Sequence, residues 1–276
     1  MAKVKAVYLY DKFMDLFPYE IKLSIGRCWY ELISKLDEGF QMPFMNYGYA
    51  ALNPYDGRID LSREDEEHRY CIQLYHHVAN AINWIGMDAL ELGCGRGGGA
   101  AYITKRFKPK SYLGIDMTAN AIDYCKQRYS IEGLSFSRCD ADNLAFKNAS
   151  FDVVISVEAS GLWRDKECTF RDIARILKPN GYFLYADLQP YEQFSTWKAQ
   201  LVASGLRLAS EEDITANVAR ALTLDYERKC ELISQHIPWL FRGIFYEFAG
   251  MSGAGLATGT PKFRNRVYYN FVLHKD

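Results

Sequence analysis

A strand-like segment, a glycine-rich loop and a helix-like segment follow one another between residues 87 and 107, and this succession constrains the fold most. MDALELG has the apolar content of a short buried strand, and GGGAAYITKRF has helical spacing. The loop that joins them reads Glu91-Leu-Gly93-Cys-Gly95-Arg-Gly97-Gly98-Gly99. Glycines in such a turn let backbone N–H groups approach a ligand, and the helix start favours a negative group. We therefore expect a ligand-binding turn at the end of a strand.

Strand-like and helix-like segments continue to alternate as far as residue 188. Helices are expected at 118–129 and 167–177, the second stopped by Lys178-Pro179-Asn180-Gly181. Strands separated by helices of this length predict βαβ units and a parallel sheet covered on both faces. The sequence therefore predicts an α/β fold with a Rossmann-like, mostly parallel sheet. Its further strands are expected at 111–116, 134–140, 151–158 and 181–188.

The segments that flank this alternation have a different pattern. Apolar residues from Ile72 to Ile85 recur at helical spacing, residues 213–232 look helical, and Ile237 to Phe248 carries an apolar helical stripe. The chain then closes with a strand-like segment, RVYYNFVLHK. We divide it into an N-terminal helical or lid segment, a cofactor-binding core, a helical lid insertion and a last core strand. These cover residues 1–85, 86–212, 213–262 and 263–276.

The spacing of the loop glycines is that of a dinucleotide fingerprint, G-x-G-x-x-G, from Gly93 to Gly98. This pattern does not separate NAD from S-adenosylmethionine. Asp116 ends the next strand about 20 residues on, where an acid binds ribose hydroxyls. The alternative for Asp116 is a turn residue that caps the helix starting at Thr118.

The motifs beyond the loop resemble those of the class I S-adenosylmethionine-dependent methyltransferases over residues 87–190. Five occur in order, each at a strand end: the glycine loop, Asp116, CDADNLAF, FDVVISVEAS and LKPNGYFLYADL. The resemblance implies a seven-stranded sheet and S-adenosylmethionine as cofactor. Within the class the chain is most similar to the phthiotriol/phenolphthiotriol dimycocerosate methyltransferases, which O-methylate long lipid-polyketide alcohols. FMNYGYA, QLYHHVA and YADLQP carry that similarity outside the core.

The resemblance also implies roles for individual residues. Gly93, Gly95 and Gly97 would face the amino-acid end of the cofactor, and Glu91 would set the loop and order the methionyl amine. Asp116 would bind the ribose diol. The adenine would contact Met117, Asp140 and the Ala141 backbone. Apart from the resemblance, the position of Tyr47 and Tyr49 in the N-terminal loop would let them close over the cofactor, or else pack as ordinary loop residues.

Four residues are candidates for removing a proton from an alcohol acceptor: His76, His77, Glu158 and Asp187. His76 borders the apolar helix face and has a half-buried structural role as its alternative, whereas His77 looks more exposed. Asp187 ends the fifth strand and has a helix cap near Pro190 as its alternative. Related enzymes often carry a histidine just after the SVEAS segment, but residues 161–165 hold none.

Charge and cysteine content limit the kinds of partner, metal site and compartment that are expected for the chain. The net charge of −1 over 276 residues gives no reason to expect nucleic acid. Seven cysteines without a CxxC pair argue against disulfides and zinc, and favour reduced thiols in the cytoplasm. No metal site is expected. The chain shows no signal-peptide pattern and no apolar run of membrane-spanning length, so integral membrane contact is not expected. A homodimer is left open.

The leading hypothesis is methyl transfer from S-adenosylmethionine to a small apolar acceptor, at a hydroxyl of a lipid or polyketide-like molecule. C- or N-methylation, which needs no strong base, is the first alternative. A methyltransferase fold that keeps the cofactor structurally while catalysing another reaction is the second. An NAD(P)-dependent oxidoreductase would need a hydride-transfer constellation, such as a Tyr/Lys pair, that the sequence does not show.

Overall fold

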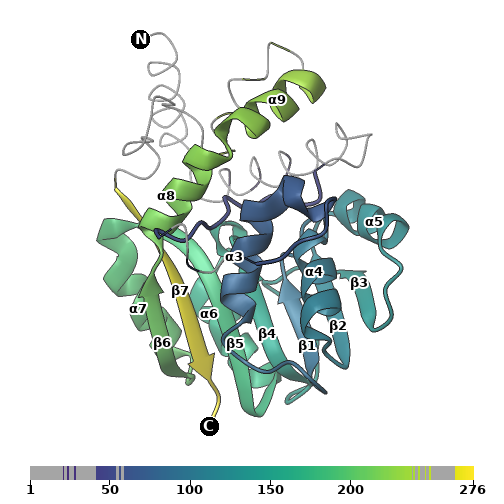
Figure 1. Cartoon of the computed structure of the whole chain (residues 1–276). Coiled ribbons are helices and arrows are strands. Elements are labelled where there is room, and N and C mark those ends of the chain that lie inside the picture. Colours follow the sequence, from purple (N-terminus) through teal and green to yellow (C-terminus); the bar gives the residue numbers. More distant parts are fainter. Residues whose placement is uncertain are drawn as a thin grey trace.

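A seven-stranded sheet forms the centre of the computed structural model (Figure 1). The structure describes residues 42–53, 56, 59–237 and 265–276, and isolated positions at 21, 24, 28, 239, 242, 246 and 249. The strand order is β3-β2-β1-β4-β5-β7-β6. The strands are β1 (Asp88–Leu92), β2 (Ser111–Asp116), β3 (Leu134–Arg138), β4 (Phe151–Val157), β5 (Leu177–Pro190), β6 (Arg207–Asp213) and β7 (Arg266–His274).

All neighbouring strands from β3 to β5 pair in parallel, and β7 runs antiparallel to both β5 and β6. The predicted Rossmann-like, mostly parallel, seven-stranded sheet is thus confirmed. The sheet order reverses direction between β1 and β4, so a crevice opens at their carboxyl ends. This is the edge where the glycine loop leaves β1.

Helices cover both faces of the sheet, as Figure 1 shows. One core cluster joins the sheet to α3, α4, α5 and α8, and the other joins it to α6 and α7. The helices are α3 (Arg69–Ala79), α4 (Gly98–Phe107), α5 (Ala119–Arg128), α6 (Lys166–Ile176), α7 (Phe194–Ala203), α8 (Thr215–Leu224) and α9 (Tyr226–His236). Short 3-10 turns are η1 (Asp65–His68), η2 (Ser160–Leu162) and η3 (Tyr191–Gln193).

Three element boundaries differ from the sequence-based expectation. The helix expected up to Ile85 ends at Ala79, and Ile85 is 74% exposed. Strand β5 starts at Leu177, which pairs with Phe151 before a register shift, rather than after the Pro-Asn-Gly segment. The helical stretch expected at 213–232 is two helices, which meet at Asp225. Pairing with a neighbouring strand overrode the local turn signal in β5.

The two helices of this stretch have different surroundings. Val218 and Leu222 of α8 are buried in the sheet core, whereas Ile233 and Ile237 at the end of α9 pack against Met42 and Met45. Helix α9 therefore leaves the sheet and covers the segment 42–53, which we call the strap. Most of residues 1–40 of the N-terminal segment, most of the apolar stripe at 237–248 and residues 251–261 of the expected insertion lie outside the described residues.

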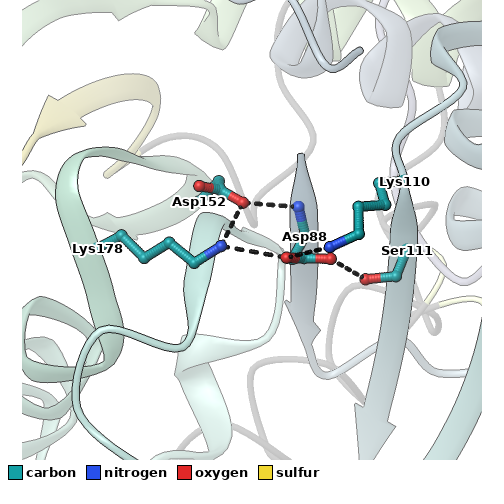
Figure 2. Close-up of polar contacts among 5 residues, drawn as sticks. All are labelled: Asp88, Lys110, Ser111, Asp152 and Lys178. Atoms are coloured by element: carbon teal, nitrogen blue, oxygen red, sulfur yellow. Dashed lines mark hydrogen bonds and ion pairs between the residues drawn. The ribbon is translucent and has the colours of Figure 1, made fainter. Parts of the chain in front are cut away.

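A polar cluster ties the amino ends of four strands together, at the edge opposite the crevice (Figure 2). The Asp88 carboxylate of β1 accepts from the Ser111 hydroxyl over 2.7 Å and from the Lys110 and Lys178 ammonium groups over 3.2 and 3.1 Å. Lys178 also donates to Asp152 over 2.8 Å. The Ser111 hydroxyl, followed by the two ammonium groups, lowers the pKa of Asp88 to about 2.

Candidate cofactor and acceptor pocket

A pocket of about 970 Å³, counting the space at its open mouth, lies at the carboxyl edge of the sheet. The turns after β1, β2, β3 and β4 form its floor, and strap residues 43–46 form its roof. This is the position that open α/β sheets offer to ligands. Of the sequence-predicted site residues, seven line it: Gly93, Gly95, Asp116, Met117, Asp140, Ala141 and Glu158. Glu91, Gly97, Tyr47, His76 and Asp187 are not among the lining residues.

The glycine loop needs glycine for a left-handed backbone and for close approach of neighbouring residues. Gly93 has a φ of +72°, and a Cβ added there would lie 2.4 Å from the Cβ of Ala159. A Cβ on Gly99 would lie 2.0 Å from the Tyr75 ring, so α3 approaches α4 closely only because no side chain intervenes. Gly97 likewise makes room for Cys125 and Phe136, away from the pocket lining. The loop thus combines a ligand-facing half with a packing half.

Asp116 braces this loop from the end of β2. Its Oδ2 accepts from the Gly95 N–H over 3.0 Å, and its Oδ1 accepts from the Thr118 N–H over 2.8 Å. Each carboxylate oxygen has a second lone pair, so hydroxyl donors of a ligand can still be accepted. Burial raises the pKa of Asp116. The helix-cap alternative from the sequence and a ribose-binding role are therefore compatible at this residue.

The turns after β2 and β3 build one side of the pocket, where the adenine is expected from the sequence. Met117, Asp140 and Ala141 line it together with Cys139, whose N–H donates to the Asp116 carbonyl over 3.0 Å. The Asp140 carboxylate accepts from the Asp142 N–H over 3.1 Å, which closes a tight turn. A carboxylate beside a thioether and a methyl group suits a flat, nitrogen-rich ring.

Glu91 lies behind the pocket, fully buried in β1. Its two oxygens accept from the Tyr75 hydroxyl over 2.8 Å and the Tyr112 hydroxyl over 3.0 Å. Burial raises the pKa of Glu91 to about 7, against the two hydrogen bonds, which lower it. Tyr75, and not Glu91 itself, is among the residues that line the pocket.

Glu158 lies on the pocket wall directly after β4. Its Oε1 accepts from the Tyr47 N–H and from the Tyr268 hydroxyl, each over 2.9 Å. Burial raises the pKa of this carboxyl to about 7. The backbone of Glu158 has a φ of +55°, a left-handed conformation that costs a non-glycine residue about 1–2 kcal/mol. Strain of this kind persists where the surrounding contacts fix it, and functional sites are a common place for it.

Asp187 is buried next to this turn but does not line the pocket. Its Oδ2 accepts from both the N–H and the hydroxyl of Ser160, over 2.9 and 2.6 Å, and burial raises its pKa. Its Oδ1 accepts from the Leu188 N–H over 2.7 Å. The carboxylate thus binds the start of η2, which follows Glu158, rather than a helix near Pro190.

The two adjacent histidines of α3 face different neighbours. His76 Nδ1 lies 2.8 Å from the Tyr102 hydroxyl of α4, and its ring packs on Phe107. His77 Nε2 lies 2.8 Å from Glu212, and its ring stacks on Tyr49 at 4.2 Å. His76 is half-buried between helices and lies outside the pocket lining. Tyr49 packs on the same helix.

Tyr47 connects the pocket wall to helix α9. Besides the bond of its N–H to Glu158, its carbonyl accepts from the Lys229 ammonium of α9 over 3.2 Å. Lys229 is buried, and its Nζ lies 3.8 Å from the Asp225 carboxylate. The strap is thereby held between β4 and α9 by its backbone, a contact that side-chain type does not reveal in a sequence.

Several lining residues have no signal that the sequence analysis used. The guanidinium of Arg96 lies over the Tyr124 ring at 3.9 Å, and Asn46 donates to the Cys71 carbonyl over 3.3 Å. Trp163 stacks on Tyr185 beneath the turn after β4. The position of Arg96 within the glycine loop was available as a signal, whereas Asn46 and Trp163 reach the pocket only through tertiary packing. The remaining apolar lining includes Phe44, Met45 and Leu162.

Within the described ranges, no three His, Cys, Asp or Glu side chains gather as a metal site would require. In the same part of the chain, no helix has the length and apolar character needed to cross a membrane.

Comparison with known proteins agrees with this geometry. Residues 90–185 match a methyltransferase domain family. The chain is 37% identical over 233 residues to the phthiotriol/phenolphthiotriol dimycocerosates methyltransferase of Mycobacterium tuberculosis, covering 84% of this chain and 86% of that protein. It is also 37% identical over 199 residues to a fatty-acid O-methyltransferase of Mycolicibacterium smegmatis, covering 72% of each.

Among solved structures, the fold resembles the [4+2]-cyclase SpnF, with a TM-score of 0.68 and 17% identity over 90% of this chain and 93% of that one. The open glycine turn and the unsaturated acceptor capacity of Asp116 fit S-adenosylmethionine. Fold, pocket and relatives together define an S-adenosylmethionine-dependent methyltransferase of class I. Within that class, the chain belongs to the phthiotriol/phenolphthiotriol dimycocerosates methyltransferase family.

Proposed function

We propose that this enzyme methylates a hydroxyl group of an apolar, lipid- or polyketide-like acceptor, and that Glu158 is the base that removes the hydroxyl proton. The observation that carries the proposal is the position of Glu158, a half-buried side chain on the pocket wall whose carboxyl pKa is raised to about 7 by desolvation. A base with a pKa near neutrality serves proton removal at physiological pH. His76, His77 and Asp187, the other candidates, make their contacts outside the lining.

The acceptor end of the pocket favours an alcohol over a carboxylate. The lining that includes Glu158 also contains the apolar side chains of Phe44, Met45, Leu162 and Trp163. A second carboxylate beside Glu158 would meet a like charge in a poorly solvated place, which disfavours its binding. Among the described lining residues the one cation is Arg96, whose guanidinium lies over Tyr124. The relative from Mycobacterium tuberculosis is named for a triol-derived lipid, which agrees with an alcohol.

In the proposed reaction S-adenosylmethionine supplies an electrophilic methyl group on its sulfonium. Glu158 would accept the hydroxyl proton at its carboxylate while the acceptor oxygen bonds to the methyl carbon. The bond from that carbon to sulfur would break, with its electron pair left on the sulfur of the departing S-adenosylhomocysteine. Gly93 and Gly95 would face the methionine end of the cofactor, and Asp116 would accept from its ribose. Met117, Asp140 and Ala141, which line the same pocket, would contact its adenine. The strap excludes water, so that positioning and desolvation contribute to the rate.

The test compares Glu158→Gln with the wild type on a long-chain alcohol and on a fatty acid. For the wild type we expect methylation of the alcohol, with a rate that rises as the pH increases through about 7, where the Glu158 carboxyl loses its proton. We expect the variant to lose about 100-fold or more in kcat, in keeping with the size of general-base effects.

Binding of S-adenosylmethionine, measured by calorimetry, should stay within a few-fold of the wild type in Glu158→Gln. The matched control is Glu167→Gln, which removes an exposed carboxylate on α6 and should leave the rate unchanged. Full turnover by Glu158→Gln, or a preference for the fatty acid, would contradict the proposal. C- or N-methylation without a base would then be the better account.

The proposal extends to the setting of the enzyme. We place it in the cytoplasm because its seven cysteines carry free thiols, as in a reducing compartment. A homodimer is a further part of the proposal, and sedimentation analysis of the purified chain tests it.

A further inference from the structure

Tyr268 of β7 contacts Glu158 without lining the pocket. Its side chain is fully buried on the sheet face that carries α3 and α8, and its hydroxyl donates to Glu158 Oε1. Its backbone is anchored at the start of α8, where the Tyr268 N–H donates to Thr215 Oγ1 over 2.8 Å and its carbonyl accepts from the Ile214 N–H over 2.9 Å. The Tyr268 residue is therefore fixed at its backbone and at its hydroxyl.

Both donors to the Glu158 side chain use the same oxygen. The Tyr47 N–H and the Tyr268 hydroxyl reach Oε1, and no hydrogen bond within the described part of the chain reaches Oε2. A carboxylate that is fixed at one oxygen presents the lone pairs of the other in a defined direction. Because Glu158 lines the pocket, that direction is available to a ligand.

We propose that Tyr268 is a positioning residue for the methyl-transfer reaction, which holds Oε1 of Glu158 so that Oε2 faces the acceptor hydroxyl. The inference rests on the proposed role of Glu158 as the base. Tyr268 acts through Glu158 alone, since its own ring is shielded from the pocket.

Charged and titratable groups face Glu158 from each packed element. Asp187 of β5 raises the pKa of Glu158, and Lys229 of α9 lowers it, while Tyr75 and Cys71 of α3 lie near it as neutral groups. The Tyr268 hydroxyl lowers the pKa because it donates to the ionised carboxylate. Removing that hydroxyl leaves the other groups in place and should raise the pKa.

The test is the pH dependence of kcat/KM for the alcohol acceptor in Tyr268→Phe. We expect the acid limb to move up by about one pH unit, the size of effect that one charge-assisted hydrogen bond supplies. On the high-pH plateau we expect kcat to fall about tenfold, with KM for S-adenosylmethionine unchanged. The matched control is Tyr269→Phe, whose ring lies on the other face of β7, 4.3 Å from Phe194. Its profile should equal that of the wild type.

A second readout separates this role from a purely structural one. In protein labelled with ¹³C at glutamate carboxyls, Glu158→Gln identifies the Glu158 resonance, and its titration should move upward in Tyr268→Phe. A variant with a lower Tm but an unchanged titration and rate profile would overturn the inference. If Glu158→Gln keeps full activity, the base itself is wrong. If Glu158→Gln is inactive while Tyr268→Phe behaves as the wild type, only the role of Tyr268 is wrong.

Discussion

At the scale of single residues, Glu91 and Glu158 show that two glutamates with similarly raised pKa values can differ in their access to the pocket. Burial raises the pKa of Glu91 and of Glu158 to about 7 in each case. Glu91 is enclosed by the hydroxyls of Tyr75 and Tyr112, whereas Glu158 is exposed to the pocket and is bound at one oxygen. A proton acceptor must reach its donor as well as have a suitable pKa, so only Glu158 satisfies both conditions.

Gly93 provides a prediction at the same scale. In Gly93→Ala, the left-handed backbone and the contact with Ala159 should together lower the free energy of unfolding by about 2–5 kcal/mol and abolish cofactor binding. Gly205→Ala and Gly161→Ala are the controls. Gly205 has a φ of +88°, but an added Cβ would meet no atom within 4 Å, and a Cβ added at Gly161 would also meet none. Denaturant unfolding should show the largest loss in the free energy of unfolding for Gly93→Ala, a smaller one for Gly205→Ala and the smallest for Gly161→Ala. Equal losses at Gly93 and Gly205 would show that the contact with Ala159 contributes nothing.

At the scale of elements, the strap joins three parts of the chain that are distant in sequence. The N–H of its residue Ala50 donates to the Asn217 carbonyl of α8 over 3.2 Å, and the Asn217 side-chain amide donates to the Ala50 carbonyl over 3.1 Å. Its residue Tyr47 connects β4 to α9, and Pro43 accepts from the Gly98 N–H over 3.1 Å. A movement of α9 therefore bears on the roof of the pocket and on the carboxylate beneath it.

Lys229→Met tests this coupling. Loss of the ammonium removes the bond to the Tyr47 carbonyl and leaves Asp225 with Arg228, so we expect a stability loss of about 1–3 kcal/mol. We expect KM for the acceptor to rise several-fold, because the roof is held less firmly. The control Lys198→Met removes an ammonium that pairs with Glu211 at the surface. Equal kinetics in Lys229→Met and the wild type would show that the strap does not depend on α9.

At the scale of the whole molecule, the two edges of the sheet have separate tasks. The carboxyl edge carries the pocket, and the amino edge carries the Asp88 cluster, which ties β1, β2, β4 and β5 (Figure 2). Because the cluster is far along the strands from the pocket, stability and ligand binding can be altered independently.

Asp88→Asn should change acid stability without changing activity at neutral pH. The pKa of Asp88 lies at about 2 in the folded chain, below its ordinary 3.8, so the unfolded chain binds the proton first. Its contribution is complete above about pH 4 and is lost as the pH falls toward 2. Urea unfolding across this range should therefore be steeper in pH for the wild type than for the variant. Asp123→Asn, an exposed carboxylate on α5, is the control. If the stability of Asp88→Asn depends on pH as steeply as that of the wild type, Asp88 does not contribute to acid stability in this way.

Much of the fold was predictable because its strands and helices have strong local periods. The parallel core and the glycine turn follow from apolar segments, glycine spacing and helix lengths, and the structure has them where the pattern predicts. The boundaries at Ala79 and Leu177 were not predictable, since tertiary pairing decides where an element ends. Similarly, Asp187 was expected at the ligand edge but binds Ser160, because only the packed turn brings them together.

By itself, the sequence determined the class of fold, because apolar periodicity and glycine spacing are carried by contiguous residues, and its ordered motifs predicted the cofactor through their resemblance to known methyltransferases. Only the tertiary structure showed that Glu158 lines the pocket whereas His76, His77 and Asp187 do not, although residue type alone made all four candidates. It also decided that Tyr47 contributes its backbone and that Tyr268, more than 100 positions away, reaches Glu158. The physical reason is that burial and hydrogen-bond geometry arise from elements brought together in the sheet, and no local pattern encodes them.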